Sequence, residues 1–136
     1  MPSIKSEIFT ALTEDSVLMA FFGDDNTKVT DEFPSKDLFG DAAADNFPRL
    51  TYSMADRKPV FFTDNAPQKD EVIMVFSVWL LPSSLMTVTL AQVASELTRI
   101  LKTIDYTKTG SDEQFNVDQK VFYTSLTYFK NVDSNL

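Results

Sequence analysis

The stretch that decides the fold is EVIMVFSVWLL, residues 71–81. Its side chains are apolar at even positions from 72 to 78 and at most odd positions as well. Successive side chains of a strand point to opposite faces, so a strand here has two apolar faces instead of one. Such a strand belongs in the interior of a sheet. Either helices cover both sides, or helices cover one side and something outside the single chain covers the other.

Further strands are indicated on both sides of this stretch. Residues 49–54 alternate apolar and polar side chains, as expected of a strand with one buried face, and the pattern continues toward Phe62. The composition of residues 64–70 predicts a turn, which would make the two strands an antiparallel pair. Residues 115–132 also predict strands, with a possible turn at 117–120, and the last of these strands is again apolar on both faces.

Helices are predicted in two places. Ser3 is a plausible N-cap for a first helix over residues 4–12, and Thr13 is a plausible cap for a second that ends at Gly23. The strongest amphipathic pattern covers residues 90–104 after a cap at Thr87 or Thr89. Gly110 and its polar neighbours predict the next break in the chain.

The order of these elements predicts an α+β fold, with a largely antiparallel sheet of four to five strands and helices packed on one face. The length of 136 residues predicts a single domain over residues 1–136. Residues 24–46 are rich in Asp, Asn, Thr, Gly and Pro and predict a long loop.

The composition excludes several classes of function. The chain has neither cysteine nor histidine, so thiol chemistry, disulfides and histidine catalysis are all excluded. We therefore expect no enzyme, no metal and no cofactor, although a carboxylate-only or lysine-based enzyme would pass this filter. A net charge of −8 disfavours tight binding to nucleic acid or to anionic membranes. The first ten residues lack the features of a signal peptide, which predicts synthesis in the cytoplasm.

An acidic segment is the first candidate site, because carboxylate oxygens are the ligands that calcium prefers. Its spacing does not fit a calcium-binding loop, so we interpret it as a solvated loop that docks to other proteins or faces a lumen. The candidates in this loop are Asp24, Asp25, Asp31, Glu32, Asp37, Asp41 and Asp45. Asn65 and Lys69, in the predicted turn, are further docking candidates.

A second candidate surface follows from the surplus of apolar strand surface. The predicted helices are too few to cover both faces of the sheet, and an exposed apolar face invites aggregation. Burial against a sister subunit resolves this, and burial under the loop at 24–46 is the competing explanation. The candidate subunit-interface residues are Ile73, Val75, Trp79, Tyr123 and Phe129.

The whole pattern resembles the tail-completion, or tail-terminator, proteins that join head and tail in long-tailed bacteriophages. The resemblance lies in the helix pair that ends at Gly23-Asp24, the strand FPRLTY at 47–52, the strand at 72–81 with its tryptophan, the helix at 90–104, and the closing strand FYTSLTY at 122–128. Family members often carry a basic residue near the middle of that last strand, where this chain has Thr124 and Ser125.

The resemblance implies a structural virion protein of the tail or neck, made in the host cytoplasm. It implies a homo-oligomer, typically a hexameric ring, that caps the tail tube and docks to the head connector. An acidic lumen would let DNA pass without tight binding. Two alternatives stay open: an acidic non-enzymatic adaptor or regulator that binds another protein, and a small carboxylate-based hydrolase.

Overall fold

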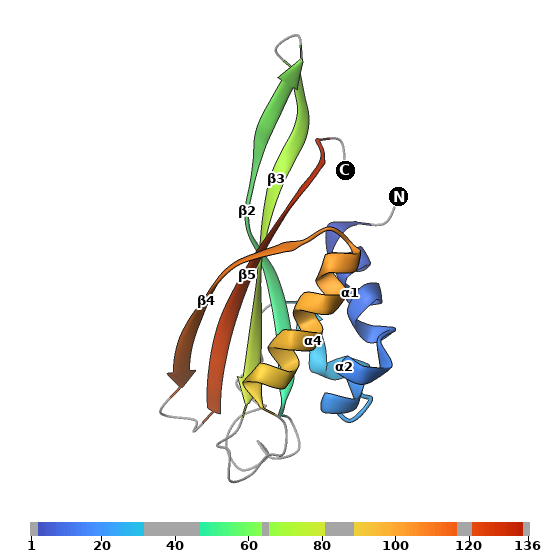
Figure 1. Ribbon diagram of the computed structural model, residues 1–136, viewed down its shortest axis with the longest axis vertical. Coiled ribbons are helices and arrows are strands. Elements are labelled where there is room, and N and C mark those ends of the chain that lie inside the picture. Colours follow the sequence, from blue (N-terminus) through green and yellow to red (C-terminus); the bar gives the residue numbers. More distant parts are fainter. Residues whose placement is uncertain (1–2, 32–46, 64–65, 81–88, 117–120, 135–136) are drawn as a thin grey trace.

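A computed structural model describes residues 3–31, 47–63, 66–80, 89–116 and 121–134 (Figure 1). Its elements are α1 (Ile4–Thr13), α2 (Ser16–Phe21), the 3-10 turn η1 (Asn26–Lys28), β1 (Val29–Asp31), β2 (Arg49–Thr63), β3 (Ala66–Leu80), α4 (Leu90–Thr103), β4 (Thr107–Asn116) and β5 (Val121–Asp133). The predicted order of helices and strands is confirmed, with β1 as an addition.

Local capping chemistry explains where the helices begin. The Ser3 side chain accepts a hydrogen bond from the Ser6 amide and starts α1, as predicted. The predicted cap at Thr13 is wrong, because its hydroxyl donates to the carbonyl of Phe9 in the preceding turn. Asp15 caps α2 instead, and its carboxylate accepts two backbone N–H groups.

The long helix α4 begins at Leu90, directly after its N-cap Thr89, which forms a complete capping box with Gln92. It ends before Asp105, whose φ of 71° lies in the left-handed region. The break predicted at Gly110 is wrong. This glycine lies inside β4, where the register with β5 shifts between Lys108 and Gly110.

The sheet has the strand order β1-β2-β3-β5-β4, with β3 in its centre as predicted. β1 pairs with β2 in parallel, and the other three pairs are antiparallel. β1 lies in the segment predicted to be an irregular loop, because its three residues pair with Leu50, Thr51 and Tyr52. The turn predicted over residues 64–70 is too long, because β3 begins at Ala66.

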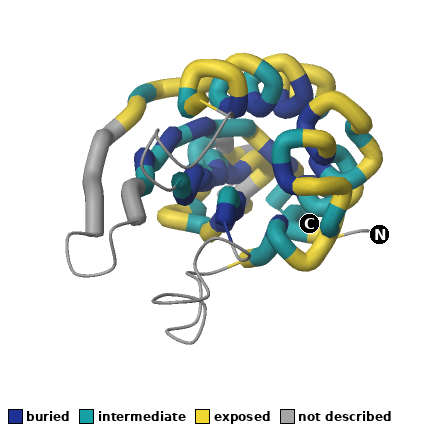
Figure 2. The backbone as a smooth tube through the Cα atoms, turned by 90° about the horizontal axis from the view of Figure 1, so that it is seen from below, coloured by how far each residue is buried: buried dark blue, intermediate teal, exposed yellow. Residues whose placement is uncertain are grey.

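The three α-helices of the described chain pack on one face of the sheet, which confirms the predicted α+β arrangement (Figure 1). Even-numbered residues of β3, from Val72 to Val78, join the core cluster with Leu97 of α4 and Leu12 of α1. Phe76 lies at the centre of this face, edge-on to the ring of Tyr128. Figure 2 shows the helices buried toward the sheet and exposed on their outer side.

Candidate assembly surface

The face of the sheet that points away from the helices is called the outer face below. Below the register shift between Met54 and Asp56 it consists of odd-numbered residues of β2, together with the odd-numbered residues of β3 and β5 that pair with one another, since neighbours in the antiparallel register lie on the same side. Its members are Arg49, Thr51 and Ser53 of β2, Ile73, Val75, Ser77 and Trp79 of β3, and Tyr123, Ser125, Thr127 and Phe129 of β5.

All five residues predicted for a subunit interface lie on the outer face. Ile73 pairs with Phe129 toward one end, and Trp79 pairs with Tyr123 toward the other. The rings of Trp79 and Tyr123 stack with their centroids 4.3 Å apart. Trp79 is only 5% exposed, whereas the other four residues are half-buried. Their role as an interface stays a prediction, but their placement on one face is observed.

The outer face is less apolar than the sequence predicts. A row of hydroxyl groups, from Thr51, Ser77 and Ser125, crosses it between the two bulky ends. The Trp79 indole N–H donates to the Thr51 hydroxyl at 2.9 Å, and the hydroxyls of Ser77 and Ser125 lie 3.2 Å apart. The predicted second apolar face is therefore interrupted at this row, where small polar side chains pair with one another across strands.

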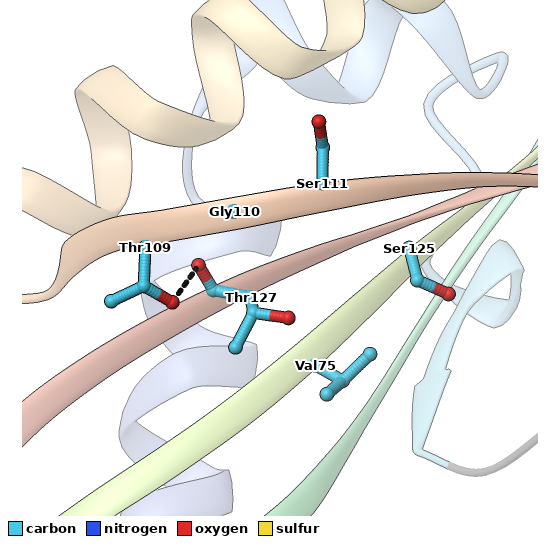
Figure 3. Close-up of a pocket in the computed structure, with 6 residues that line it drawn as sticks. All are labelled: Val75, Thr109, Gly110, Ser111, Ser125 and Thr127. Carbon is cyan, nitrogen blue, oxygen red and sulfur yellow. Dashed lines mark hydrogen bonds between the residues drawn. The ribbon is translucent and has the colours of Figure 1, made fainter.

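Next to the hydroxyl row, the outer face carries a shallow hollow of about 430 Å³. It forms where small side chains and a glycine replace the bulky ones found at both ends of the face. In Figure 3 the side chains of Val75 and Ser125 lie on one side of the sheet, and that of Ser111 lies on the other. Residues lining the hollow are Val75, Thr109, Gly110, Ser111, Ser125 and Thr127, none of which is ionisable.

Arg49 is a charged residue of the outer face, at the end of β2 that pairs with Trp79. Its residue is 8% exposed, and the guanidinium donates to the carbonyl of Thr27 at 2.7 Å. Burial lowers the pKa of Arg49, and the nearby carboxylate of Asp25 opposes that shift. This hydrogen bond connects the first residue of β2 to η1, so Arg49 has a structural role within the single chain.

The acidic docking candidates are partly described. Asp24 adopts a φ of 57° next to Gly23, which closes the turn after α2. Asp25 caps η1, and its hydrogen bonds from the Thr27 side chain and backbone lower its pKa. Asp31 forms an exposed ion pair with Lys5 at 3.3 Å. Glu32, Asp37, Asp41 and Asp45 lie outside the described residues, as does Asn65.

The described carboxylates do not converge on a site. In the part of the chain that the structure describes, no group of three or more Asp and Glu residues could hold a metal ion. Within the same residues, no helix is long and apolar enough to cross a membrane. Of the described carboxylates, that of Asp25 caps η1 and that of Asp31 pairs with Lys5.

One ionic contact connects two helices in a way that sequence reasoning missed. Arg99 of α4 bonds to Glu96 in its own helix and to Asp15, the cap of α2, both at 2.7 Å. The pKa of Asp15 is lowered because backbone amides and Arg99 together outweigh the effect of burial. The first contact has the i, i+3 spacing typical of side-chain pairs on a helix, but nothing local signals the second.

Lys69, the remaining docking candidate, lies on the hairpin of β2 and β3. It pairs with Asp133 of β5 at 2.6 Å. Nearby Phe62 is 60% exposed, the largest exposure of any bulky apolar residue in the described chain. Its position beside the predicted turn was the available signal for a surface role.

A solved structure shares this fold. The structure is that of the virion of a native gene transfer agent particle, and one of its chains matches with a TM-score of 0.55 at 14% sequence identity. The match covers 93% of this chain and 92% of that one. No family model and no curated protein matches the chain. The fold is therefore one that a virion component also adopts.

Proposed function

We propose that this chain is a structural virion protein, and specifically a tail-completion subunit that forms a ring, caps the tail tube and joins the tail to the head connector. The observation that carries the proposal is the fold shared over almost the full length of both chains with a component of a virion. The resemblance in sequence pattern to tail-completion proteins points to the same class.

The outer face supports assembly on physical grounds. The described helices leave it uncovered, and four half-buried apolar residues, Ile73, Val75, Tyr123 and Phe129, present part of their surface there. Burial of this exposed apolar surface against a partner stabilises the contact by about 25 cal/mol for each Å² removed from water. A ring of identical subunits supplies such a partner at every position without an additional protein.

The charge of the chain suits a conduit for DNA. Each subunit carries a net charge of −8, and six copies, the number that the family resemblance implies, multiply the field around a central channel. Such a field repels the phosphate backbone, so DNA passes without adhering to the wall. The function is non-enzymatic in this proposal, and the subunit acts by shape and contact alone.

The proposal is tested by growing tail tubes from the tube protein of the same phage, with and without this chain, and measuring tube lengths by electron microscopy. We expect a narrow distribution of tube lengths and closed tube ends when the folded chain is present during tube growth. The same chain denatured beforehand is the control for added protein. Unchanged lengths and open ends with the folded chain would rule out a terminator role.

A further inference from the structure

The hairpin of β2 and β3 projects well beyond the helices and the rest of the sheet (Figure 1). We call its described part the arm, namely residues 56–63 of β2 and 66–71 of β3. The core cluster of the described chain includes β2 no further than Met54 and β3 no earlier than Val72. A segment with few buried apolar contacts opens at a low free energy. The arm therefore depends on other contacts to stay joined to the sheet.

A break in the strand pairing marks the base of the arm. The register of β2 against β3 shifts between Met54 and Asp56, directly where the arm begins. Such a shift leaves one residue of the bulged strand unpaired and bends that strand locally. Two more shifts follow between Pro59 and Phe62. The pairing inside the arm is therefore separated from the regular pairing next to the core.

Three polar residues join the three strands at the base of the arm, on the side that faces the helices. Arg57 of β2 donates to the carboxylate of Asp70 on β3 at 2.6 Å. The hydroxyl of Ser134, directly after β5, donates to the same carboxylate at 2.8 Å. We call these three residues the clamp. Asp70 is only 8% exposed, and a buried carboxylate without such partners is costly, so the clamp holds best when it is complete.

Further contacts at the same place extend the clamp. The amide of Ser134 donates to the carbonyl of Gln68 at 3.2 Å, and the guanidinium of Arg57 reaches the carbonyl of Ser134 at 3.4 Å. The ion pair of Lys69 with Asp133 joins β3 to β5 as well, but both of its side chains are about half exposed. Exposed ion pairs contribute little, so the less exposed clamp is the stronger connection.

We propose that the arm opens as a unit separate from the core, and that the clamp of Arg57, Asp70 and Ser134 is the latch that holds it closed. An arm held by a few hydrogen bonds can change its path while the core behind it stays folded. The inference concerns motion within the single chain, so it goes beyond the proposed role in a tail and does not depend on it.

Hydrogen–deuterium exchange of the folded chain, read by mass spectrometry of its peptides, tests this latch. In the wild-type chain the amides of the arm should exchange faster than those of α4. Ser134→Ala removes one hydrogen bond to an ionised group, a loss that shifts an opening equilibrium by about tenfold. We therefore expect exchange in the arm to become about tenfold faster, with exchange in α4 unchanged. Arg57→Gln removes the other side-chain bond to Asp70 and should have the same effect.

The matched control is Lys58→Gln, at the next residue of β2 and on the opposite side of the sheet. The Lys58 nitrogen lies 3.7 Å from Glu71, and the lysine side chain is 58% exposed. This variant removes the same charge from the same strand but leaves the clamp intact, so exchange in the arm should change by less than about twofold.

Three results would overturn the proposal. Equal acceleration by Lys58→Gln and Arg57→Gln would show that the loss of a charge suffices and that the clamp is not the latch. Unchanged exchange in the arm of Ser134→Ala and Arg57→Gln would show that the clamp holds nothing. Acceleration of α4 together with the arm would show that the arm and the core open as one unit.

Discussion

Replacing Tyr128 by phenylalanine tests how α4 sits on the sheet. The phenol of Tyr128 is fully buried, and its hydroxyl lies 2.7 Å from that of Thr98 on α4. In Tyr128→Phe the half-buried Thr98 hydroxyl can turn to a carbonyl of its own helix, so we expect a loss of about 1 kcal/mol. Thr98→Val leaves the buried phenol without this partner and should cost about 2 kcal/mol.

The double variant distinguishes a real contact from mere proximity. Removing both hydroxyls leaves no unpaired group at this point, so Thr98→Val with Tyr128→Phe should cost about 1 kcal/mol instead of the additive 3 or so. Urea unfolding followed by the fluorescence of Trp79, the single tryptophan, gives all four free energies. Additive losses with unchanged m-values would show that the two hydroxyls do not meet, and the placement of α4 would be refuted.

Three groups of variants test other contacts by urea unfolding. Tyr106→Phe should raise stability by about 1 kcal/mol at neutral pH, because the described residues offer no hydrogen-bond partner to this buried phenol. Burial raises the pKa of Tyr106 to about 12, so the unfolded chain loses the phenol proton at a lower pH than the folded chain does. The free energy of unfolding should therefore fall between about pH 10 and pH 12, and it should fall less steeply in Tyr106→Phe. The hydrogen bond from Arg57 lowers the pKa of Asp70, so its stabilising effect is present above about pH 4 and lost as the pH falls below that value. Asp70→Asn should therefore flatten the decline of the urea midpoint between about pH 5 and pH 2, and an unchanged slope would count against the ion pair. Thr89→Ala should cost about 1 kcal/mol through loss of the capping box, and Leu97→Ala about 3 kcal/mol through a core cavity. A loss below about 0.3 kcal/mol in either variant would contradict the described cap or core.

The elements that local chemistry specifies could be predicted from sequence. Ser3 and Thr89 each stand immediately before an amphipathic repeat, and both cap the helices expected of them. The central strand was predictable because residues 72–76 are apolar at consecutive positions, a pattern that suits a strand in the interior of a sheet.

Elements that depend on distant pairing could not be predicted. β1 has three residues and no pattern of its own, and it exists because it pairs with residues 50–52 of β2. Residues 66–70 have the composition of a turn, yet they extend β3 because β2 lies opposite. Gly110 looks like a chain break, but the partner β5 accommodates it at a register shift.

The candidate surface was predictable in part, for a similar reason. Strand periodicity alone places Ile73 and Val75 on the same face of β3. It likewise places Tyr123 and Phe129 on the same face of β5. Only the register between β3 and β5 shows that the two faces coincide. The hollow depends on small residues contributed by three strands, so no single stretch of sequence reveals it.

The central claim is that copies of this chain assemble into a ring at the end of a tail tube. Electron microscopy with rotational averaging of tube ends, after incubation with the purified chain, examines that claim directly. The account predicts a closed ring of added density with six-fold symmetry at one end of each tube. Bare ends, or density bound along the sides of the tube, would contradict it.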